Sequence, residues 1–353
     1  MEGRTEKKDI RTLSLEELIT FFIDHNDKAF RAKQVYEWLW KKSARSFDEM
    51  TNLSLESRKL LETHFTINAV KIANSQISSD QTVKNIFRLF DGKAVEGVLI
   101  PSKQRTTACI SSQVGCSLSC KFCATGRLER LRNLNADEMY DQVVLISNQA
   151  IDLYKTPLSN IVYMGMGEPL LNYRNVLQSI EKITSREGLN MSPQRITVST
   201  AGIAKMIKKL GDDEVKFNLA LSLHAANDNK RSLIMPINEQ NSLASLKEAL
   251  SYFYEKTGTR VTYEYIIFND FNDNLTDATE LAEFCKHVPC KVNIIEYNPI
   301  EGGAFQQTTE EKLTAFIHYL ERKNIIVNVR RSRGKDIDAA CGQLANKNLV
   351  QIP

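Results

Sequence analysis

The chain has 353 residues, of which 42% are hydrophobic and 25% charged, so it can build one large domain and a small one around a sizeable core. Its formal net charge of +3 is too small to demand a polyanionic partner and does not exclude one. The charged N-terminal stretch lacks the apolar core of a signal peptide, and no apolar run reaches the roughly 18 residues of a membrane span, so we expect a cytoplasmic protein without a membrane anchor.

The first 66 residues predict a small, mainly helical domain. Ser14 and Glu17 form a capping-box pattern ahead of apolar residues, and residues 30–45 form a second helical pattern. That second pattern mixes basic residues with Tyr36, Trp38 and Trp40. Such a mixture can bind RNA through phosphate contacts and stacking, or it can be an amphipathic helix with buried aromatics and solvated lysines. Composition alone favours the second interpretation.

Residues 67–104 predict a short β-rich connector with a turn at Asp91-Gly92. From 105 to 345, β-branched apolar segments alternate with helical patterns, which predicts an α/β fold of parallel βαβ units in an open sheet or a barrel. Capping boxes are expected at Asn135 with Glu138 and at Thr308 with Glu311. Residues 346–353 are expected to be a tail. The predicted strands are Cys109–Val114, Asn160–Met164, Arg195–Ser199, Phe217–Leu223, Val261–Phe268, Val292–Tyr297 and Ile325–Val329.

Four of the seven cysteines lie within residues 109–123, and an odd number of cysteines is poorly suited to a secreted disulfide framework. Such a cluster favours metal or redox chemistry in a reducing compartment. Cys116, Cys120 and Cys123 have C-x3-C-x2-C spacing directly after the first predicted barrel strand. Three thiolates on one tight loop can bind three irons of a 4Fe-4S cluster and leave the fourth iron open. A zinc site would normally need a fourth Cys or His nearby, and the sequence has none at matching spacing.

This cysteine motif resembles the signature of the radical SAM superfamily over residues 105–345, which implies an incomplete (βα)6-type barrel. In that superfamily the open iron chelates S-adenosylmethionine (SAM), and an electron from the cluster cleaves it to a 5′-deoxyadenosyl radical. The resemblance assigns SAM contacts to polar residues at the ends of later strands, where parallel α/β folds place their ligands. Those residues are Gly167 and Glu168 of a Gly-Met-Gly-Glu-Pro motif, Ser199, Ser222, Leu223, His224 and Asn298.

Five strings narrow the resemblance to one family. They are Ile110–Cys116, Cys123–Gly126, Met164–Leu170, Leu221–Ala225 and Asp336–Leu344, and in this order they resemble the RlmN-type dual-specificity RNA (adenine-C2)-methyltransferases over nearly the whole chain. The resemblance implies methylation of an adenosine at the peptidyl-transferase centre of 23S rRNA and of the adenosine 3′ to the anticodon in some tRNAs. It also implies that the N-terminal domain helps to hold RNA.

The same resemblance assigns catalytic roles to Cys341, Cys109 and Glu96. Cys341 would take a methyl group from one SAM, and the radical from a second SAM would then let that carbon add to C2, forming a transient protein–RNA crosslink. Glu96 would be the general base for the C2 proton, and Cys109 would resolve the crosslink through a transient disulfide. A lone cysteine is more often a buried hydrophobe, but the cationic segment before Cys341 favours a thiolate. Cys285 and Cys290 match no motif and are expected to be structural.

Two other functions remain open at this point. A Cfr-type enzyme would modify C8 of the same rRNA adenine, whereas an RNA-binding iron–sulfur redox sensor would have no need of Cys341 or Cys109. The expected partners are 23S rRNA, tRNA and an electron donor such as a flavodoxin or ferredoxin system, and the chain is expected to act as a monomer. The basic loops Arg127–Arg132 and Arg330–Lys335 would suit phosphate contacts.

Overall fold

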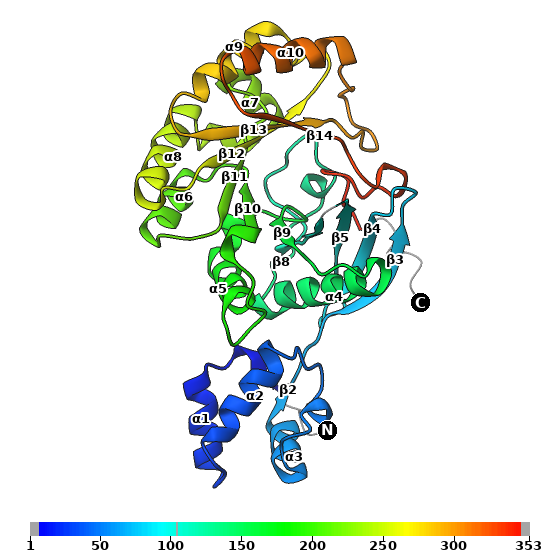
Figure 1. Cartoon of the computed structure of the whole chain (residues 1–353), viewed down its shortest axis with the longest axis vertical. Coiled ribbons are helices and arrows are strands. Elements are labelled where there is room, and N and C mark those ends of the chain that lie inside the picture. Colours follow the sequence, from blue (N-terminus) through cyan, green and yellow to red (C-terminus); the bar gives the residue numbers. More distant parts are fainter. Residues whose placement is uncertain (1–6, 104, 347–353) are drawn as a thin grey trace.

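The computed structural model describes residues 7–103 and 105–346. An N-terminal lobe lies at one end of the molecule, below the sheet in Figure 1. It contains α1 (Leu15–Asp24), α2 (Phe30–Trp40), α3 (Leu55–His64) and the paired short strands β1 (Lys8–Asp9) and β2 (Phe65–Thr66). The capping box of Ser14 and Glu17 is confirmed. The second helix is shorter than predicted, because Ser43 adopts a left-handed backbone conformation with φ of 57°.

The aromatic residues of α2 divide between two environments. Trp40 is buried and packs edge-on against Tyr140 of α4 (Ala136–Tyr154), with their ring centroids 5.2 Å apart. Lys182 of α5 (Tyr173–Thr184) lies 5.1 Å from the ring centroid of Tyr36 and 5.4 Å from that of Trp40. These two aromatics therefore dock the N-terminal lobe on the barrel. Trp38 remains partly exposed, with Lys42 over its ring.

Among the described residues, one ten-stranded sheet forms the body of the molecule, with strand order β14-β13-β12-β11-β10-β9-β6-β5-β4-β3. The part from β6 to β14 is parallel. Its strands are β6 (Arg105–Cys109), β9 (Asn160–Tyr163), β10 (Ile196–Thr200), β11 (Asn218–Ser222), β12 (Val261–Ile267), β13 (Cys290–Glu296) and β14 (Val327–Arg330). The helices that connect them, after α4 and α5, are α6 (Ala204–Asp212), α7 (Asp228–Ile234), α8 (Leu243–Thr257), α9 (Leu275–Phe284) and α10 (Glu310–Arg322).

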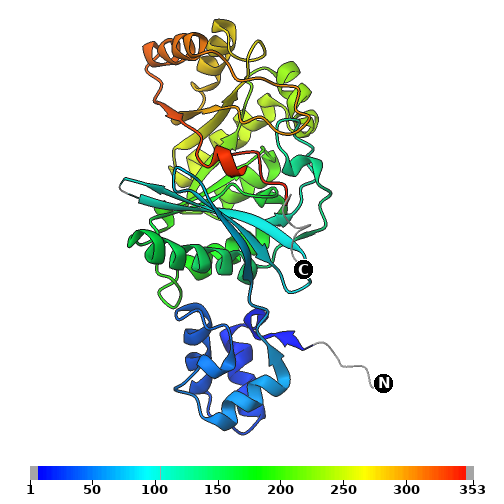
Figure 2. The ribbon, with the colours of Figure 1, turned by 90° about the vertical axis from the view of Figure 1, so that its right-hand side faces the viewer.

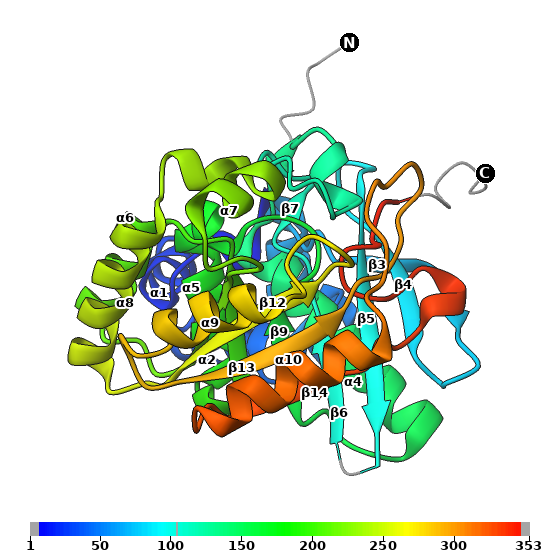
Figure 3. The same cartoon turned by 90° about the horizontal axis from the view of Figure 1, so that it is seen from above.

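Figure 3 shows α6, α8 and α10 on the outer side of the curved sheet. Helical connections between successive parallel strands confirm the predicted α/β fold and its incomplete radical SAM barrel. Within residues 7–103 and 105–346, no helix combines the length and the apolar character needed to span a membrane.

The β-rich connector extends the barrel's own sheet. Its strands β3 (Lys71–Ile77), β4 (Val83–Arg88) and β5 (Ala94–Ser102) are antiparallel, and β5 pairs with β6. The predicted turn at Asp91-Gly92 joins β4 to β5. The predicted division of the chain into domains stays a prediction. Most of the predicted C-terminal tail, residues 347–353, lies outside the described part of the chain.

Two local predictions were wrong by a few residues. The strand expected at Cys109–Val114 ends at Cys109, and β7 (Gln113–Val114) pairs instead with β8 (Arg132–Asn133), a partner that no local pattern reveals. The cap of α10 is Thr309, which accepts from the backbone N–H of Lys312, whereas the Thr308 hydroxyl donates to a carboxylate oxygen of Asp273. The capping box of Asn135 and Glu138 is confirmed.

The segment after β14 bridges the two ends of the open sheet. The backbone N–H of Gly334 donates to Asp80 (3.0 Å), and the hydroxyl of Ser78 donates to Asp336 (2.5 Å). In Figures 1 and 2 this red segment runs beside β4 and β5. Cys341 therefore lies on a segment that spans from the last parallel strand to the antiparallel strands.

Candidate functional site

One cavity at the carboxyl ends of the parallel strands contains most of the predicted site residues. It has about 840 Å³ of empty space, part of it open to solvent. The predicted residues that line it are Cys116, Cys120, Cys123, Gly167, Glu168, Ser199, Ser222, His224 and Cys341.

The three loop cysteines line the same cavity. Among the described residues, no three His, Cys, Asp or Glu side chains converge on a single-ion site. A 4Fe-4S cluster needs a different geometry, because each thiolate binds a different iron. Burial raises the pKa of the Cys116 thiol to about 11 and also raises the pKa of Cys123. Without a metal these thiols therefore keep their protons, and a cluster would have to displace them on binding. Three cysteines on one loop at the edge of the cavity fit such a cluster.

Gly167 and Glu168 form part of the cavity wall close to another loop. Gly167 has φ of +96°, and a Cβ atom at this position would lie 2.5 Å from the Cβ of Gln113. Only glycine permits both this conformation and this close approach. The carboxylate of Glu168 accepts from the backbone N–H groups of Leu170 (3.0 Å) and Ala201 (2.7 Å). The side chain of Thr200 is a further hydrogen-bond partner of this carboxylate, whose oxygens still have acceptor capacity for a ligand donor.

The residues on or just after β10 and β11 that are expected to contact SAM lie in different environments. The hydroxyls of Ser199 and Ser222 are 3.3 Å apart on the cavity wall. Burial lowers the pKa of His224 to about 3, and its Nδ1 accepts from the backbone N–H of Ile266, so the neutral ring carries its proton on Nε2. The side chain of Leu223 is fully buried in the core and does not line the cavity.

Asn298 lies behind Cys341 and does not line the cavity. Its Nδ2 donates to the backbone carbonyl of Cys341 (3.3 Å), and its buried Oδ1 has no hydrogen-bond partner within the described chain. A buried acceptor without a partner is costly. An amino group of a ligand, such as that of adenine, would satisfy it.

Cys341 is exposed and lies beside the cluster loop. The backbone N–H of Ala124 donates to the carbonyl of Gly342 (2.7 Å), and the hydroxyl of Thr125 donates to the carbonyl of Leu344 (2.6 Å). These bonds hold the segment of residues 341–344 against the loop that contains Cys123. Cys341 thus lies beside the three cluster cysteines, although they precede it by more than two hundred residues in the sequence.

Cys109 and Glu96 are buried beneath that segment. Burial raises the pKa of Cys109 to about 12, with a further contribution from the charge of Cys341. The carboxylate of Glu96 accepts from the backbone N–H groups of Ala345 (2.8 Å) and Asn346 (3.1 Å), and it lies 3.8 Å from the ammonium group of Lys84. Glu96 is therefore beside the Cys341 segment but does not line the cavity. All seven cysteines are free thiols, so the structure does not contain the expected disulfide.

Sequence reasoning missed a charged pair in the cavity wall. Glu264 of β12 is 3% exposed, and its carboxylate accepts from Nη1 of Arg330 at 3.2 Å and from Nδ2 of Asn293 at 2.7 Å. Arg330 had been expected at an RNA-contacting loop. The sequence did contain a signal for this pair: Glu264 is the one charged residue in the otherwise uncharged strand Val261–Ile267. A buried charge requires a partner, so this glutamate could have predicted a buried ion pair.

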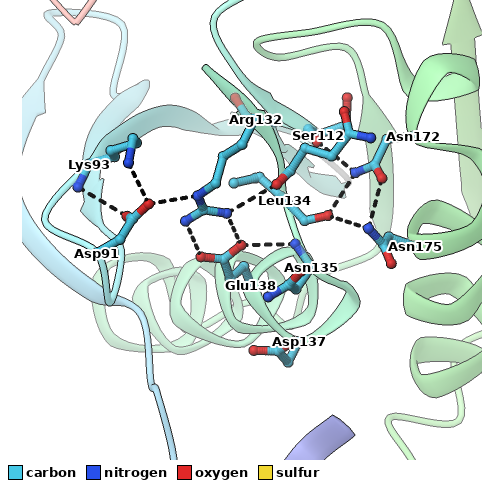
Figure 4. Close-up of polar contacts among 12 residues, drawn as sticks. Asp91, Lys93, Ser112, Arg132, Leu134, Asn135, Asp137, Glu138, Asn172 and Asn175 are labelled. Carbon is cyan, nitrogen blue, oxygen red and sulfur yellow. Dashed lines mark hydrogen bonds and ion pairs between the residues drawn. The ribbon is translucent and has the colours of Figure 1, made fainter. Parts of the chain in front are cut away.

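A second network fixes the exit of the cluster loop (Figure 4). Arg132 donates to Asp91 from Nε (2.7 Å) and to Glu138 from Nη1 (2.7 Å). Arg127 at the other end of this basic loop donates to the carbonyls of Glu301 and Gly302. Both arginines already bind protein acceptors, which weakens the expectation that this loop contacts phosphate.

The comparisons with known proteins show the family of this chain. Residues 8–67 match the family described as "Ribosomal RNA large subunit methyltransferase N-terminal domain", and residues 110–282 match the radical SAM superfamily. Proteins described as probable dual-specificity RNA methyltransferase RlmN are 63% identical in Cytophaga hutchinsonii (98% of this chain, 94% of the relative) and 45% identical in Salinibacter ruber (97% and 95%). A crystal structure of a radical SAM methyltransferase from Sphaerobacter thermophilus is 37% identical, with a TM-score of 0.90 over 96% of this chain and 99% of that chain.

Proposed function

This chain belongs to the RlmN family of dual-specificity RNA methyltransferases in the radical SAM superfamily, and we propose that it methylates C2 of specific adenosines in 23S rRNA and tRNA. Its cofactors are SAM and one 4Fe-4S cluster. The proposed rRNA target is at the peptidyl-transferase centre, and the proposed tRNA target is the adenosine 3′ to the anticodon. A reducing protein such as a flavodoxin or ferredoxin would supply electrons in the cytoplasm.

The observation that carries this proposal is the presence of Cys341 in the cavity that contains the three cluster thiols. When bound there, the cluster and SAM supply the reductive radical chemistry and the methyl group. Cys116, Cys120 and Cys123 would hold the cluster. SAM would be held by the polar groups of the cavity wall, and the contact between Asn298 and SAM stays a prediction.

Cys341 would act as the methyl carrier. Its sulfur would lose its proton and bond to the methyl carbon while the bond from that carbon to the sulfonium sulfur of SAM breaks, and the exposure of this residue leaves room for that displacement. After one hydrogen atom of the S-methyl group has passed to the radical derived from a second SAM, the carbon would bond to C2 of the adenine. C2 has no acidic proton and is electron-poor, so addition of a carbon radical suits it better than ordinary methyl transfer does.

Release of the RNA needs a base for the C2 proton and a second thiol. We assign the base to Glu96, whose carboxylate lies beneath the Cys341 segment, and the thiol to Cys109. Attack of Cys109 on the sulfur of Cys341 would free the methylated adenine and leave a transient disulfide. The position of Cys109 supports this role, because it is buried and close enough for its charge to interact with that of Cys341.

Cysteine substitutions test the proposal directly. In anaerobic turnover with RNA, Cys341→Ala should reduce methylation to background and form no crosslink, whereas Cys109→Ala should accumulate covalent protein–RNA on a denaturing gel. Cys285→Ala is the matched control, because this half-buried thiol lies outside the cavity and should behave as wild type. Methylation by Cys341→Ala would contradict the methyl-carrier role.

Mass spectrometry of the product nucleosides distinguishes the position of methylation. 2-Methyladenosine is the expected product, and 8-methyladenosine would assign the chain to the Cfr-type activity. Anaerobic reconstitution followed by EPR of the reduced protein is the accompanying measurement. The signal of the 4Fe-4S cluster should shift on addition of SAM, and a cluster that does not respond to SAM would favour a redox sensor.

A further inference from the structure

Cys285 and Cys290, which match no motif, meet where a helix ends and the next strand begins. Cys285 is the C-cap of α9, and Cys290 is the first residue of β13. The thiol of Cys290 donates to the backbone carbonyl oxygen of Cys285, with 3.6 Å between sulfur and oxygen. The two thiols also form a side-chain hydrogen bond with each other. Two free, half-buried thiols in contact across a short loop are placed to form a disulfide.

The neighbouring strand β12 packs against both ends of this loop. Val261 pairs with Cys290, and the ring of Tyr263 packs edge-on against that of Phe284, the residue before Cys285, with centroids 5.2 Å apart. The buried hydroxyl of Tyr263 has no hydrogen-bond partner among the described residues. Burial raises the pKa of Tyr263, and negative charge on Cys290 and Cys285 raises it further, so both sulfurs lie in electrostatic range of one hydroxyl. The packing therefore confines the two thiols to one small region.

The two thiols differ in how readily they ionise. Their mutual hydrogen bond lowers the pKa of Cys290 and raises that of Cys285, because the Cys285 thiol is the donor to the ionised Cys290 sulfur. Burial opposes the effect on Cys290, and the charge of Arg260 adds to it. The thiolate is the form that attacks a disulfide. Cys290 is therefore suited to attack first, and Cys285 is suited to resolve the mixed disulfide.

The surroundings of the pair favour thiol–disulfide chemistry over metal binding or a role in the cavity. Within residues 7–103 and 105–346, no set of three His, Cys, Asp or Glu side chains could hold a metal ion. His287 of the same loop instead packs against Phe284, with ring centroids 6.3 Å apart. The seven residues of β13 separate Cys290 from the carboxyl end of the strand, where the cavity lies, by about 20 Å. A disulfide here would leave the cavity open.

We propose that Cys285 and Cys290 are a reversible dithiol site, which low-molecular-weight disulfides such as glutathione disulfide oxidise independently of the catalytic cavity. The Cys290 thiolate bonds to one sulfur of glutathione disulfide, and the other glutathione leaves with the electron pair of the broken bond. Cys285 then loses its proton and bonds to the Cys290 sulfur, and the second glutathione leaves as a thiolate. The two cysteines lose two electrons, and glutathione disulfide becomes two glutathione molecules, which take up the two protons.

Peptide mass spectrometry of the holoenzyme tests this site. The protein is exposed anaerobically to glutathione disulfide, quenched with acid, alkylated and digested with trypsin without a reductant. Trypsin cleaves after Arg260, Lys286 and Lys291, so the two cysteines fall in separate peptides, 261–286 and 287–291. These peptides should be recovered as a disulfide-linked pair that dithiothreitol separates. Recovery of both peptides with alkylated cysteines, at every concentration of glutathione disulfide, would overturn the proposal.

Single substitutions test the order of attack. In Cys285→Ala, glutathione should stay on Cys290, because the resolving thiol is missing. In Cys290→Ala, Cys285 should react about tenfold more slowly than Cys290 does in Cys285→Ala, because less of it is thiolate. A faster reaction at Cys285 would contradict the assigned order. If either variant does not fold, the wild-type time course decides the order: the first glutathione adduct should appear on peptide 287–291, and an adduct appearing first on peptide 261–286 would contradict it.

The same experiment on Cys341→Ala separates this site from the catalytic cavity. The linked pair of peptides should form in this variant at the wild-type rate, because no cavity thiol takes part in either step. A loss of the linked pair in Cys341→Ala would mean that oxidation passes through the cavity, and it would overturn the claim of an independent site. The turnover experiments of the proposed function contain no disulfide oxidant, so their outcome does not depend on this one.

Discussion

Two arginines of this molecule are held by carboxylates, but their surroundings differ. Arg11 of the N-terminal lobe has a side chain that is 3% exposed and forms ion pairs with Asp9 (3.1 Å), Asp137 (2.9 Å) and Asp141 (2.9 Å). Arg330 has a side chain that is 34% exposed and forms one ion pair, with Glu264. The first guanidinium is surrounded by acceptors, whereas the second is open to a cavity that contains a thiol. The difference separates an arginine that fixes structure from one that is available for chemistry.

The Arg11 cluster fixes the N-terminal lobe on the barrel. Asp137 and Asp141 belong to α4, so their ion pairs with Arg11 cross between the two parts of the chain. Asp141 also accepts from the backbone N–H of Val70 (2.9 Å), and Asp9 accepts from that of Asn68 (2.9 Å). The linker between the lobe and β3 is therefore held by the same carboxylates. The position of the lobe relative to the cavity depends on this cluster.

Replacement of Arg11 should have the largest effect on stability. Arg11→Met leaves three buried carboxylates without their cation, which should cost about 3 to 5 kcal/mol in the free energy of unfolding. Urea denaturation measures this loss, and limited proteolysis of the 67–70 linker reports undocking of the lobe. Arg331→Met is the control: it also pairs with two carboxylates but is exposed, so it should cost less than about 1 kcal/mol. Equal losses in the two variants would contradict the structural role of Arg11.

The stability of the Arg11 cluster should depend on pH through Asp137, a property that the Arg330 pair is not expected to share. Burial raises the pKa of Asp137 from 3.8 to about 7, against the opposing effect of Arg11. The folded protein therefore binds a proton at Asp137 that the unfolded chain releases, and stability should fall as pH rises from about 4 to 7. The contribution of this group is on the order of a few kcal/mol. Asp137→Asn should flatten the profile in this window, measured by urea denaturation at each pH, and an unchanged slope would exclude the effect.

Replacement of Arg330 should have a smaller effect on stability than replacement of Arg11. Its partner Glu264 retains a donor in Asn293, and the arginine is partly open, so Arg330→Gln should cost about 1 to 2 kcal/mol, between the values for exposed and buried pairs. The same denaturation experiment measures this loss. A cost as large as that of Arg11→Met would mean that Arg330 is primarily structural, and the contrast between the two arginines would not hold.

The sequence predicted those features that depend on local chemistry. The capping boxes at Ser14 and Asn135 are formed within four residues, and the cysteine spacing brings three thiols together on one loop. Long-range pairing was not predictable in the same way. Gln113–Val114 is a strand only because Arg132–Asn133 pairs with it, and the burial of Trp40 depends on Tyr140, one hundred residues later. Resemblance identified Cys341, but nothing in the local sequence around Arg330 showed that this arginine lines the same cavity.

The position of the bridging segment after β14 means that Cys341 is translated long after the cluster cysteines. Cys341 leaves the ribosome more than two hundred residues after the cluster cysteines, a delay of about 10 to 40 s at ordinary translation rates. Until then the cavity has no closing segment beside Cys123, and the three thiols are open to an iron–sulfur donor from that side. Translation therefore gives the nascent chain a period in which its metal centre can be loaded before the last segment covers it.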